Sequence, residues 1–188
     1  MNQYPSLETD RLLLGEIYAA DIPNIIKYAG NKKVAETTLN MPHPYQEKDA
    51  IFWINMAQQG WRDKTKNIFA IRLKTNQELI GGIGLHIEAS FNRAELGYWI
   101  AVPFWNQGYM TEAVEAVIKY GFNQLHLNKI FAVYEADNPA SGKVMLKNGM
   151  LKEGELKQHV RKNGVYIDLV QYGVLNGELR IENSLDMN

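Results

Sequence analysis

The chain has 188 residues, of which 46% are hydrophobic, and a formal net charge of −1 from 20 basic and 21 acidic residues. This length can bury one sizeable core, so we expect a single domain. The balanced charge predicts no nucleic-acid partner and no anionic membrane partner, and the absence of cysteine excludes a disulfide framework and a thiolate metal site.

The N-terminal half begins without a signal-like segment, and no apolar run approaches 18 residues, so we expect a soluble, cytoplasmic protein. Leu7–Ile17 is predicted to form a first strand. Asp21 is a suitable N-cap for a helix over Ile22–Ala29. The proline-rich segment Met41–Tyr45 cannot continue a helix, and a second helix is expected at about Glu47–Gln59.

The middle of the chain is rich in strand signals. Ile68–Leu73 and Leu79–Ile87 alternate in polarity and predict antiparallel strands joined by the polar turn Lys74–Glu78. Glu95–Val102 is short, rich in aromatic and β-branched residues, and apolar on both faces after its first residue. These features are typical of a buried central strand, which Pro103 closes because it cannot donate to a sheet ladder.

A tight loop and an amphipathic helix follow this strand. Beyond Gly108, apolar residues recur at helical spacing as far as Phe122. The loop Trp105–Thr111 therefore offers free backbone N–H groups at a positive helix N-terminus, where phosphate or pyrophosphate can bind. It lacks the ending of a Walker A loop, and Gly81–Gly84 does not fit a dinucleotide fingerprint. From these residues alone, a turn that Gly108 merely shapes explains the pattern equally well.

The C-terminal third is predicted to hold a strand, a helix and two hairpin strands, at Lys129–Ala136, Asn138–Asn148, Leu151–Arg161 and Tyr166–Leu175. Asn138 suits the N-cap because Pro139 at the first helical position lacks the N–H that would stay unpaired. Gly149 can take the left-handed conformation that ends a helix. Asn163-Gly164 is the strongest hairpin signal in the chain. Apolar residues thin out after this hairpin, so we expect the domain at 1–175 and a C-terminal tail at 176–188.

The predicted order is strand, two helices, three strands, helix, strand, helix and two strands, an α+β arrangement with a mostly antiparallel sheet. Several ordered motifs along nearly the whole chain resemble the GCN5-related N-acetyltransferases, above all their ribosomal-protein N-terminal acetyltransferase branch. The motifs are an opening ET.RL, then ELGYWI…P.W…GY.TEA from Glu95, NPAS…KNGM…EG from Asn138, and Y.D...Y from Tyr166. The resemblance implies the acyl-CoA N-acyltransferase fold, a mixed sheet with helices on both faces.

The loop after the central strand departs from the family at two positions. Laid on the family pattern [RQ]-x-x-G-x-[GA], Trp105 takes the Arg/Gln place, Gly108 the fixed glycine and Met110 the small residue. A tryptophan at the first position is familiar in this branch. Met110 would put a side chain near the expected pyrophosphate.

The resemblance implies acetyl-CoA as cosubstrate and no metal. It places backbone N–H groups of Gln107–Thr111 on the pyrophosphate and the end of the central strand against the pantetheine. The implied cofactor-binding residues are Ile100, Ala101, Val102, Gln107, Gly108, Tyr109, Met110, Thr111, Asn138 and Ser141. The residues themselves leave Thr111 open as a simple first-turn residue and favour capping alone for Asn138. The histidines are too scattered to suggest a metal site: His43, His86, His126 and His159.

Two residues are expected to act in catalysis. By resemblance, Ser141 meets the coenzyme A sulfur; its hydroxyl is a poor acid against a thiol of pKa about 8.5, so it is better described as a hydrogen-bond donor. From the residues alone, Ser141 can equally satisfy local backbone in the first helical turn. Glu95 is the best carboxylate to draw a proton from the acceptor amine, although a solvated strand end explains it as well.

The acceptor is expected to be a primary amine that takes the acetyl group directly, preferably the N-terminal α-amine of a protein or peptide. Such an amine, with pKa about 7.7–8.0, is roughly 10–20% neutral at pH 7, whereas a lysine amine near 10.4 is neutral in fewer than about one molecule in a thousand. A small-molecule amine, such as an antibiotic, a polyamine or an amino-acid derivative, is the alternative acceptor. A non-catalytic acetyl-CoA-binding module is the alternative of another class. Monomer and homodimer both stay open.

Overall fold

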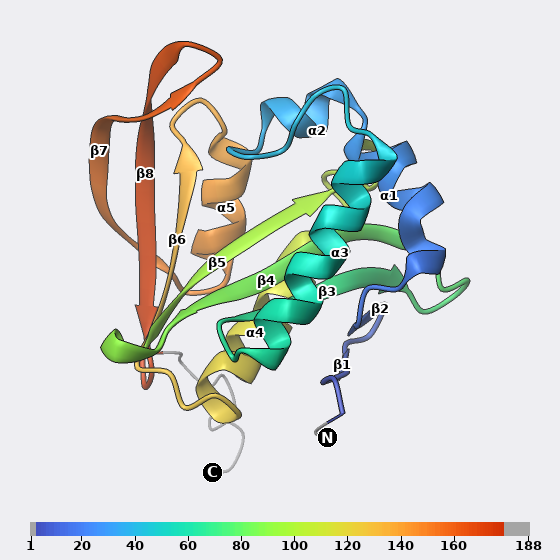
Figure 1. Cartoon of the computed structure of the whole chain (residues 1–188). Helices are drawn as coiled ribbons and strands as arrows, with labels where there is room; N and C mark the ends of the chain where they lie inside the picture. The colour runs from blue at the N-terminus through green and yellow to red at the C-terminus, as the bar shows by residue number, and fades with distance from the viewer. Residues whose placement is uncertain (1–2, 179–188) are drawn as a thin grey trace.

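The computed structural model describes residues 3–178, and one eight-stranded sheet in the order β1-β2-β3-β4-β5-β6-β8-β7 runs through them (Figure 1). The strands are β1 Leu7–Glu8, β2 Leu12–Gly15, β3 Lys66–Leu73, β4 Leu79–Glu88, β5 Arg93–Ile100, β6 Lys129–Glu135, β7 Leu151–Lys162 and β8 Val165–Leu175. Every neighbouring pair is antiparallel except β5 and β6, which are parallel. The predicted mixed, mostly antiparallel sheet is confirmed.

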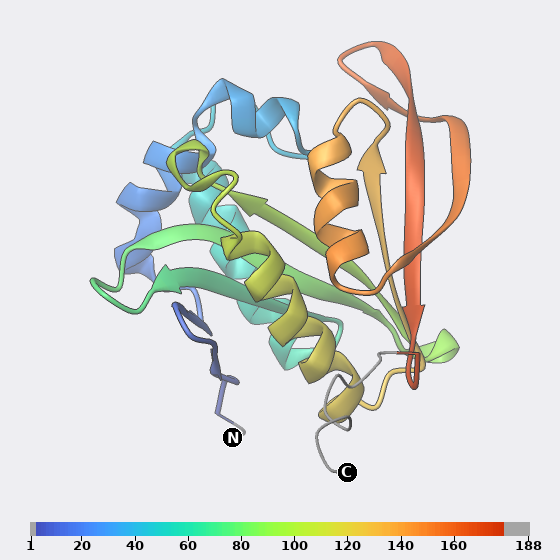
Figure 2. The same ribbon diagram turned by 180° about the vertical axis from the view of Figure 1, so that it is seen from behind.

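Helices cover both faces of the sheet (Figures 1 and 2). The α-helices in residues 3–178 are α1 Ile22–Ala29, α2 Lys32–Glu36, α3 Glu47–Arg62, α4 Tyr109–Asn123 and α5 Pro139–Lys147, and the short 3-10 turns are η1 Ala19–Asp21, η2 Ala89–Phe91 and η3 Val102–Phe104. One buried apolar cluster joins α4 to the sheet through Val117, and a second joins α1 and α3 through Ile25 and Ile54. The apolar stripes of the helices therefore build two cores, one on each face.

The N-terminal half differs from the prediction in one strand, one additional helix and one helix end. Leu7–Ile17 is two strands, because Thr9 closes a turn between them: its backbone N–H donates to Leu12 O at 3.1 Å and its hydroxyl oxygen accepts from Leu12 N at 2.9 Å. Helix α2 was not expected; Asn31 caps it by accepting from Lys33 N at 3.0 Å. Helix α3 runs three residues past its expected end, to Arg62.

The central strand ends before its predicted limit. Strand β5 stops at Ile100, and the next residues turn into η3, which contains Pro103. The remaining elements lie within two residues of their predicted bounds. Asn163 and Gly164 have φ values of 50° and 84°, as the predicted hairpin turn requires.

The parallel pair β5 and β6 separates soon after it forms. The register covers three residue pairs, from Arg93 opposite Lys129 to Glu95 opposite Phe131. Strand β5 nevertheless continues to Ile100 and β6 to Glu135, and Figure 1 shows the two strands diverging. Since no ladder bonds join them beyond Glu95, a gap opens in the middle of the sheet.

The described part of the chain ends just after β8. Residues 176–178 form a turn after β8, in which Glu178 N donates to Leu175 O at 3.1 Å. Most of the tail predicted at 176–188 lies outside the described residues. In the part of the chain that the structure describes, no helix is both long and apolar enough to span a bilayer.

Candidate active site

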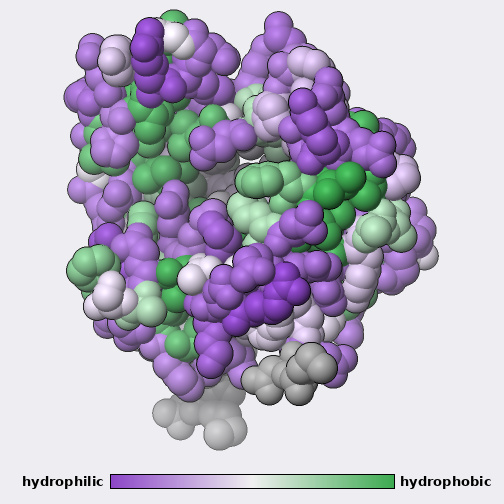
Figure 3. All heavy atoms as spheres, in the orientation of Figure 1, coloured by the Kyte–Doolittle hydropathy of each residue, from purple (hydrophilic) through white to green (hydrophobic). Residues whose placement is uncertain are grey.

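A cavity of about 260 Å³ opens where β5 and β6 diverge. Its walls come from both strands, from α5, from β4 and from the loop after α2: Thr37, Thr38, Leu39, Asn40, His86, Glu95, Leu96, Gly97, Tyr98, Val133, Tyr134, Glu135, Ser141 and Met145. Figure 3 shows the surface hollowed between the lobe of β7 and β8 and the lobe of α2 and α3. The two residues predicted to act in catalysis, Glu95 and Ser141, thus line one cavity although 46 positions separate them in sequence.

The cavity joins the two faces of the sheet. Leu96 and Tyr98 pack into the apolar cluster beneath α4, on the face that also carries α5 and Ser141. Because successive strand side chains point to opposite faces, Glu95 and Gly97 face the side of α3. Two molecules bound on opposite faces of the sheet can therefore meet through the gap.

Glu95 lies in a setting that makes it a better base than a solvated glutamate. Burial raises the pKa of Glu95, the nearby Glu88 carboxylate raises it further, and Lys66 acts in the opposite direction. A carboxylate with a raised pKa holds an abstracted proton more readily. Glu95 is the last residue of β5 that pairs with β6, and its side chain lies half-buried in the cavity.

Ser141 lies in the first turn of α5, beside Asn138. Its backbone N–H donates to Asn138 O at 3.2 Å, and its hydroxyl oxygen accepts from Asn138 Nδ2 at 3.2 Å. The hydroxyl hydrogen of Ser141 is then available to another acceptor. Asn138 occupies the N-cap position, but its side chain accepts no hydrogen bond from a helical N–H, so the favoured capping role is wrong. The side-chain amide of Asn138 also donates to Thr37 O at 3.3 Å.

The loop Trp105–Thr111 has the geometry of a helix N-terminal anion site. Gly108 takes φ +81° and precedes α4, whose first intrahelical bond runs from Glu112 N to Gly108 O at 3.1 Å. The N–H groups of Tyr109, Met110 and Thr111 come before that bond, so they have no partner within the helix. Trp105 Nε1 donates to Ile100 O at 2.8 Å, which holds the loop against the end of β5.

Met110 does not reach the space above this loop. Its side chain is 7% exposed and belongs to the apolar cluster between α4 and the sheet. The expectation that it would crowd a pyrophosphate is therefore wrong. The reason is helical geometry: Met110 shares a face with Ala113, Val114 and Val117, and this face is buried.

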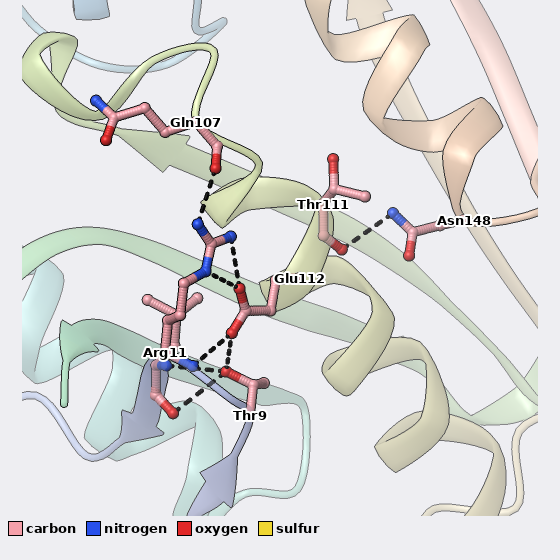
Figure 4. Close-up of polar contacts among 7 residues, drawn as sticks. Thr9, Arg11, Gln107, Thr111, Glu112 and Asn148 are labelled. Atoms are coloured by element: carbon pink, nitrogen blue, oxygen red, sulfur yellow. Dashed lines mark hydrogen bonds and ion pairs between the residues drawn. The ribbon is translucent and has the colours of Figure 1, made fainter.

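Arg11 supports the loop from the N-terminal turn, a role that was not predicted (Figure 4). Its guanidinium donates to Gln107 O at 3.0 Å, pairs with Glu112 at 2.7 Å and lies 4.2 Å from the centre of the Tyr109 ring. Burial raises the pKa of Glu112, but hydrogen bonds from Thr9 and Arg11 outweigh it, and the net pKa is lowered. The one sequence signal for Arg11 was its place in the ET.RL motif.

The end of β5 offers fewer free backbone groups than expected. Ala101 N donates to Ile80 O of β4 at 2.8 Å, so it is not available to a pantetheine. In an antiparallel pair successive residues direct their backbone groups to opposite sides. The N–H groups of Tyr98 and Ile100 therefore point toward the gap, whereas Val102 has left the strand.

The loop that walls the cavity is tied to the C-terminal hairpin by Lys162. Its ammonium pairs with the Glu135 carboxylate, a side chain 7% exposed, and donates to Glu36 O at 3.0 Å. Lys162 thus joins β7 to the end of β6 and to the last residue of α2.

Replacing Lys162 with methionine should lower the free energy of unfolding by about 1–3 kcal/mol or more. The reason is that Glu135 would keep a buried charge without its partner. Urea denaturation measures this. Lys119→Met is the matched control, since its pair with Glu115 is exposed and such pairs contribute less than about 1 kcal/mol. Equal losses in the two variants would contradict the assigned role of Lys162.

Within residues 3–178, no three histidine or acidic side chains are grouped so that they could hold a metal ion. The site consists instead of a helix N-terminus, a gap between parallel strands, a carboxylate and a hydroxyl. These parts suit an enzyme that transfers an acyl group from a phosphate-bearing carrier to an amine.

Comparison with known proteins agrees with this class. Residues 11–151 match the family described as the acetyltransferase (GNAT) domain, and the chain belongs to this family. It is 35% identical to an uncharacterized N-acetyltransferase of Bacillus subtilis, YoaA, over 92% of this chain and 97% of the relative. The protein is an N-acetyltransferase, which removes the alternative of a non-catalytic module.

Two further relatives differ in acceptor. The chain is 36% identical to the Escherichia coli ribosomal-protein-serine acetyltransferase, over 50% of this chain and 54% of that protein. The structure of Vibrio cholerae spermidine N-acetyltransferase, in complex with CoA and spermine, superposes with a TM-score of 0.77 at 21% identity and covers 91% of this chain and 99% of the other. The latter likeness shows the fold alone.

Proposed function

We propose that the protein acetylates the N-terminal α-amine of a protein or peptide with acetyl-CoA. The observation that carries this proposal is the placement of Glu95 and Ser141 in one cavity, on opposite faces of the gap between β5 and β6. The resemblance to the ribosomal-protein acetyltransferases supports the choice of acceptor. Family membership supports the choice of cosubstrate.

The free N–H groups at the start of α4 suit the pyrophosphate of acetyl-CoA. Gly108 lets the loop approach the phosphates, and Tyr109, Met110 and Thr111 would donate backbone N–H groups at the positive end of the helix dipole. Gln107 holds the loop by donating from its side chain to Pro103 O at 2.7 Å. The buried Met110 side chain leaves this surface clear.

The reaction needs a neutral amine, a polarised carbonyl and a stabilised leaving group. Acetyl-CoA, when bound, supplies an activated acetyl group as its thioester. Glu95 accepts a proton from the entering ammonium, directly or through water. The Tyr98 N–H faces the gap and can donate to the carbonyl oxygen, while the Ser141 hydroxyl donates to the departing sulfur. The acetyl group passes directly to the amine without a covalent enzyme intermediate.

The acceptor is tested with acetyl-CoA and four peptides, which carry free or blocked N-termini, each with and without an internal lysine. We expect release of the coenzyme A thiol only with free N-termini. Acetylation confined to lysine side chains would overturn the proposed acceptor and leave the acetyltransferase assignment intact. Turnover only with small amines, such as a polyamine or an aminoglycoside, would favour the second candidate, a small-molecule amine.

Glu95→Gln should reduce kcat/KM only modestly for an α-amine at pH 7, and the deficit should shrink as the pH rises to 9. The sign follows from the amine: about 10–20% is neutral at pH 7 and most is neutral at pH 9, so a base is needed less. Protonation of the amine lowers both rates below about pH 8. The advantage of the wild type over Glu95→Gln should be lost at a higher pH than an ordinary carboxylate would give, because the pKa of Glu95 is raised. Rate profiles of both enzymes from pH 5 to 9 measure this. A deficit that grows with pH would contradict the role of Glu95.

We also propose that residues 1–175 form the acetyltransferase domain and that it acts in the cytoplasm as a monomer or homodimer. One sheet spanning Leu7 to Leu175 supports the domain limits. The absence of cysteine fits a reducing compartment.

A further inference from the structure

A row of three titratable side chains crosses the sheet next to the cavity. Lys66 of β3 is opposite His86 of β4, and His86 is opposite Glu95 of β5. Residues directly opposite each other share a face, and their Cβ atoms are about 4.5–5.5 Å apart. His86 and Glu95 both line the cavity, on the face of α3. His86 has no role in the chemistry derived above.

The contact with Lys66 determines what the imidazole can offer. Lys66 Nζ lies 3.4 Å from His86 Nδ1. An ammonium group can only donate, so Nδ1 accepts and the hydrogen of a neutral ring is on Nε2. Desolvation lowers the pKa of His86, although the residue is exposed, and the charge of Lys66 lowers it further, so the ring favours its neutral form. The imidazole therefore adds one N–H donor to this side of the cavity and no free acceptor.

Glu95 and His86 together form a carboxylate acceptor beside an N–H donor. An N-terminal residue presents the complementary pair, because its ammonium donates and its carbonyl oxygen, one carbon further along, accepts. A simple alkylamine presents only the ammonium. Directly opposite side chains such as those of Glu95 and His86 are close enough to contact the ammonium and the carbonyl oxygen of one N-terminal residue.

We propose that His86 is a specificity-determining residue that donates a hydrogen bond from Nε2 to the carbonyl oxygen next to the acceptor α-amine. The site then prefers α-amino amides to alkylamines of the same size. This inference rests on the proposed function, in which the acceptor is an α-amine. Lys66 is a positioning residue for this contact, because it holds Nδ1 of the ring and so leaves the hydrogen on Nε2.

The test compares two acceptors, alaninamide and sec-butylamine, which lacks the carbonyl. The ratio of their kcat/KM values is measured for the wild type, His86→Phe and His86→Gln. We expect the phenylalanine variant to lower the ratio about three- to tenfold, the effect of one lost hydrogen bond. His86→Gln keeps an N–H donor and should retain most of the wild-type ratio. The pKa of each amine is the same in every assay. Differences between the two amine pKa values therefore cancel when the ratio of a variant is compared with that of the wild type.

Two controls separate specificity from folding. His126→Asn changes a histidine outside the cavity and should leave the ratio unchanged. An intact acetyl-CoA-induced rise in Tm shows that the His86 variants are folded. A wild-type ratio that persists in His86→Phe would overturn this inference alone. A wild type that acetylates sec-butylamine but not alaninamide would overturn both this inference and the proposed acceptor.

Discussion

Replacing Gly108 with valine is expected to abolish the thermal stabilisation that acetyl-CoA gives. At 100 times its Kd, a ligand stabilises the folded state by about 2.7 kcal/mol, which corresponds to a rise in Tm of roughly 5–10 °C for a chain of this length. Gly108 has φ +81°, a conformation that a β-branched residue adopts only with strain. A Cβ there would also lie 3.4 Å from Arg11 Nη2, which supports the loop.

Gly164→Val is the matched control for this experiment. Gly164 has φ +84°, and a Cβ at this residue would meet no other atom within 4 Å, so valine should cause similar backbone strain at the tip of the β7–β8 hairpin. We expect both apo proteins to lose stability and only the Gly108 variant to lose the acetyl-CoA shift. Differential scanning fluorimetry measures both effects. An unchanged shift in Gly108→Val would remove the loop from the cofactor site.

Ser141→Ala is expected to lower kcat about tenfold to a thousandfold while the affinity for acetyl-CoA changes little. A donor to the leaving sulfur matters most as charge develops there, and loss of one such donor has an effect of this order. Asn138 Nδ2 already occupies a lone pair of the Ser141 oxygen at 3.2 Å, which leaves the hydroxyl hydrogen to face the cavity. Steady-state rates and a binding titration separate the two effects.

The control for Ser141 is Ser90→Ala, an exposed serine in η2 outside the cavity. Asn138→Ala should lower kcat less than Ser141→Ala, because it keeps the Ser141 hydroxyl and removes the Asn138 amide that contacts this hydroxyl and Thr37 O. Equal turnover for Ser141→Ala and the wild type would leave Ser141 as a polar residue that satisfies local backbone. Equal weakening of binding and turnover would indicate a cofactor contact made throughout the reaction.

Local signals in the sequence predicted most elements because they depend on neighbouring residues. The change to helical spacing beyond Gly108 located the start of α4. Asn163-Gly164 located the hairpin because few residues accept two positive φ values in succession. The break between β1 and β2 was missed because the apolar pattern does not show it. Leu7–Ile17 has one apolar pattern, and the turn inside it depends on the Thr9 side chain.

The sequence by itself predicted most of the elements, a candidate anion-binding loop and, by resemblance, the family. Only the tertiary structure decided which side chains meet. Glu95 and Ser141 share a cavity because β5 and β6 separate after three residue pairs, and Arg11 reaches Gln107 across 96 positions of the chain. The face of Met110 and the row that joins His86 to Glu95 follow from packing and strand register. Such contacts depend on long-range pairing, and no local pattern of residues encodes that pairing.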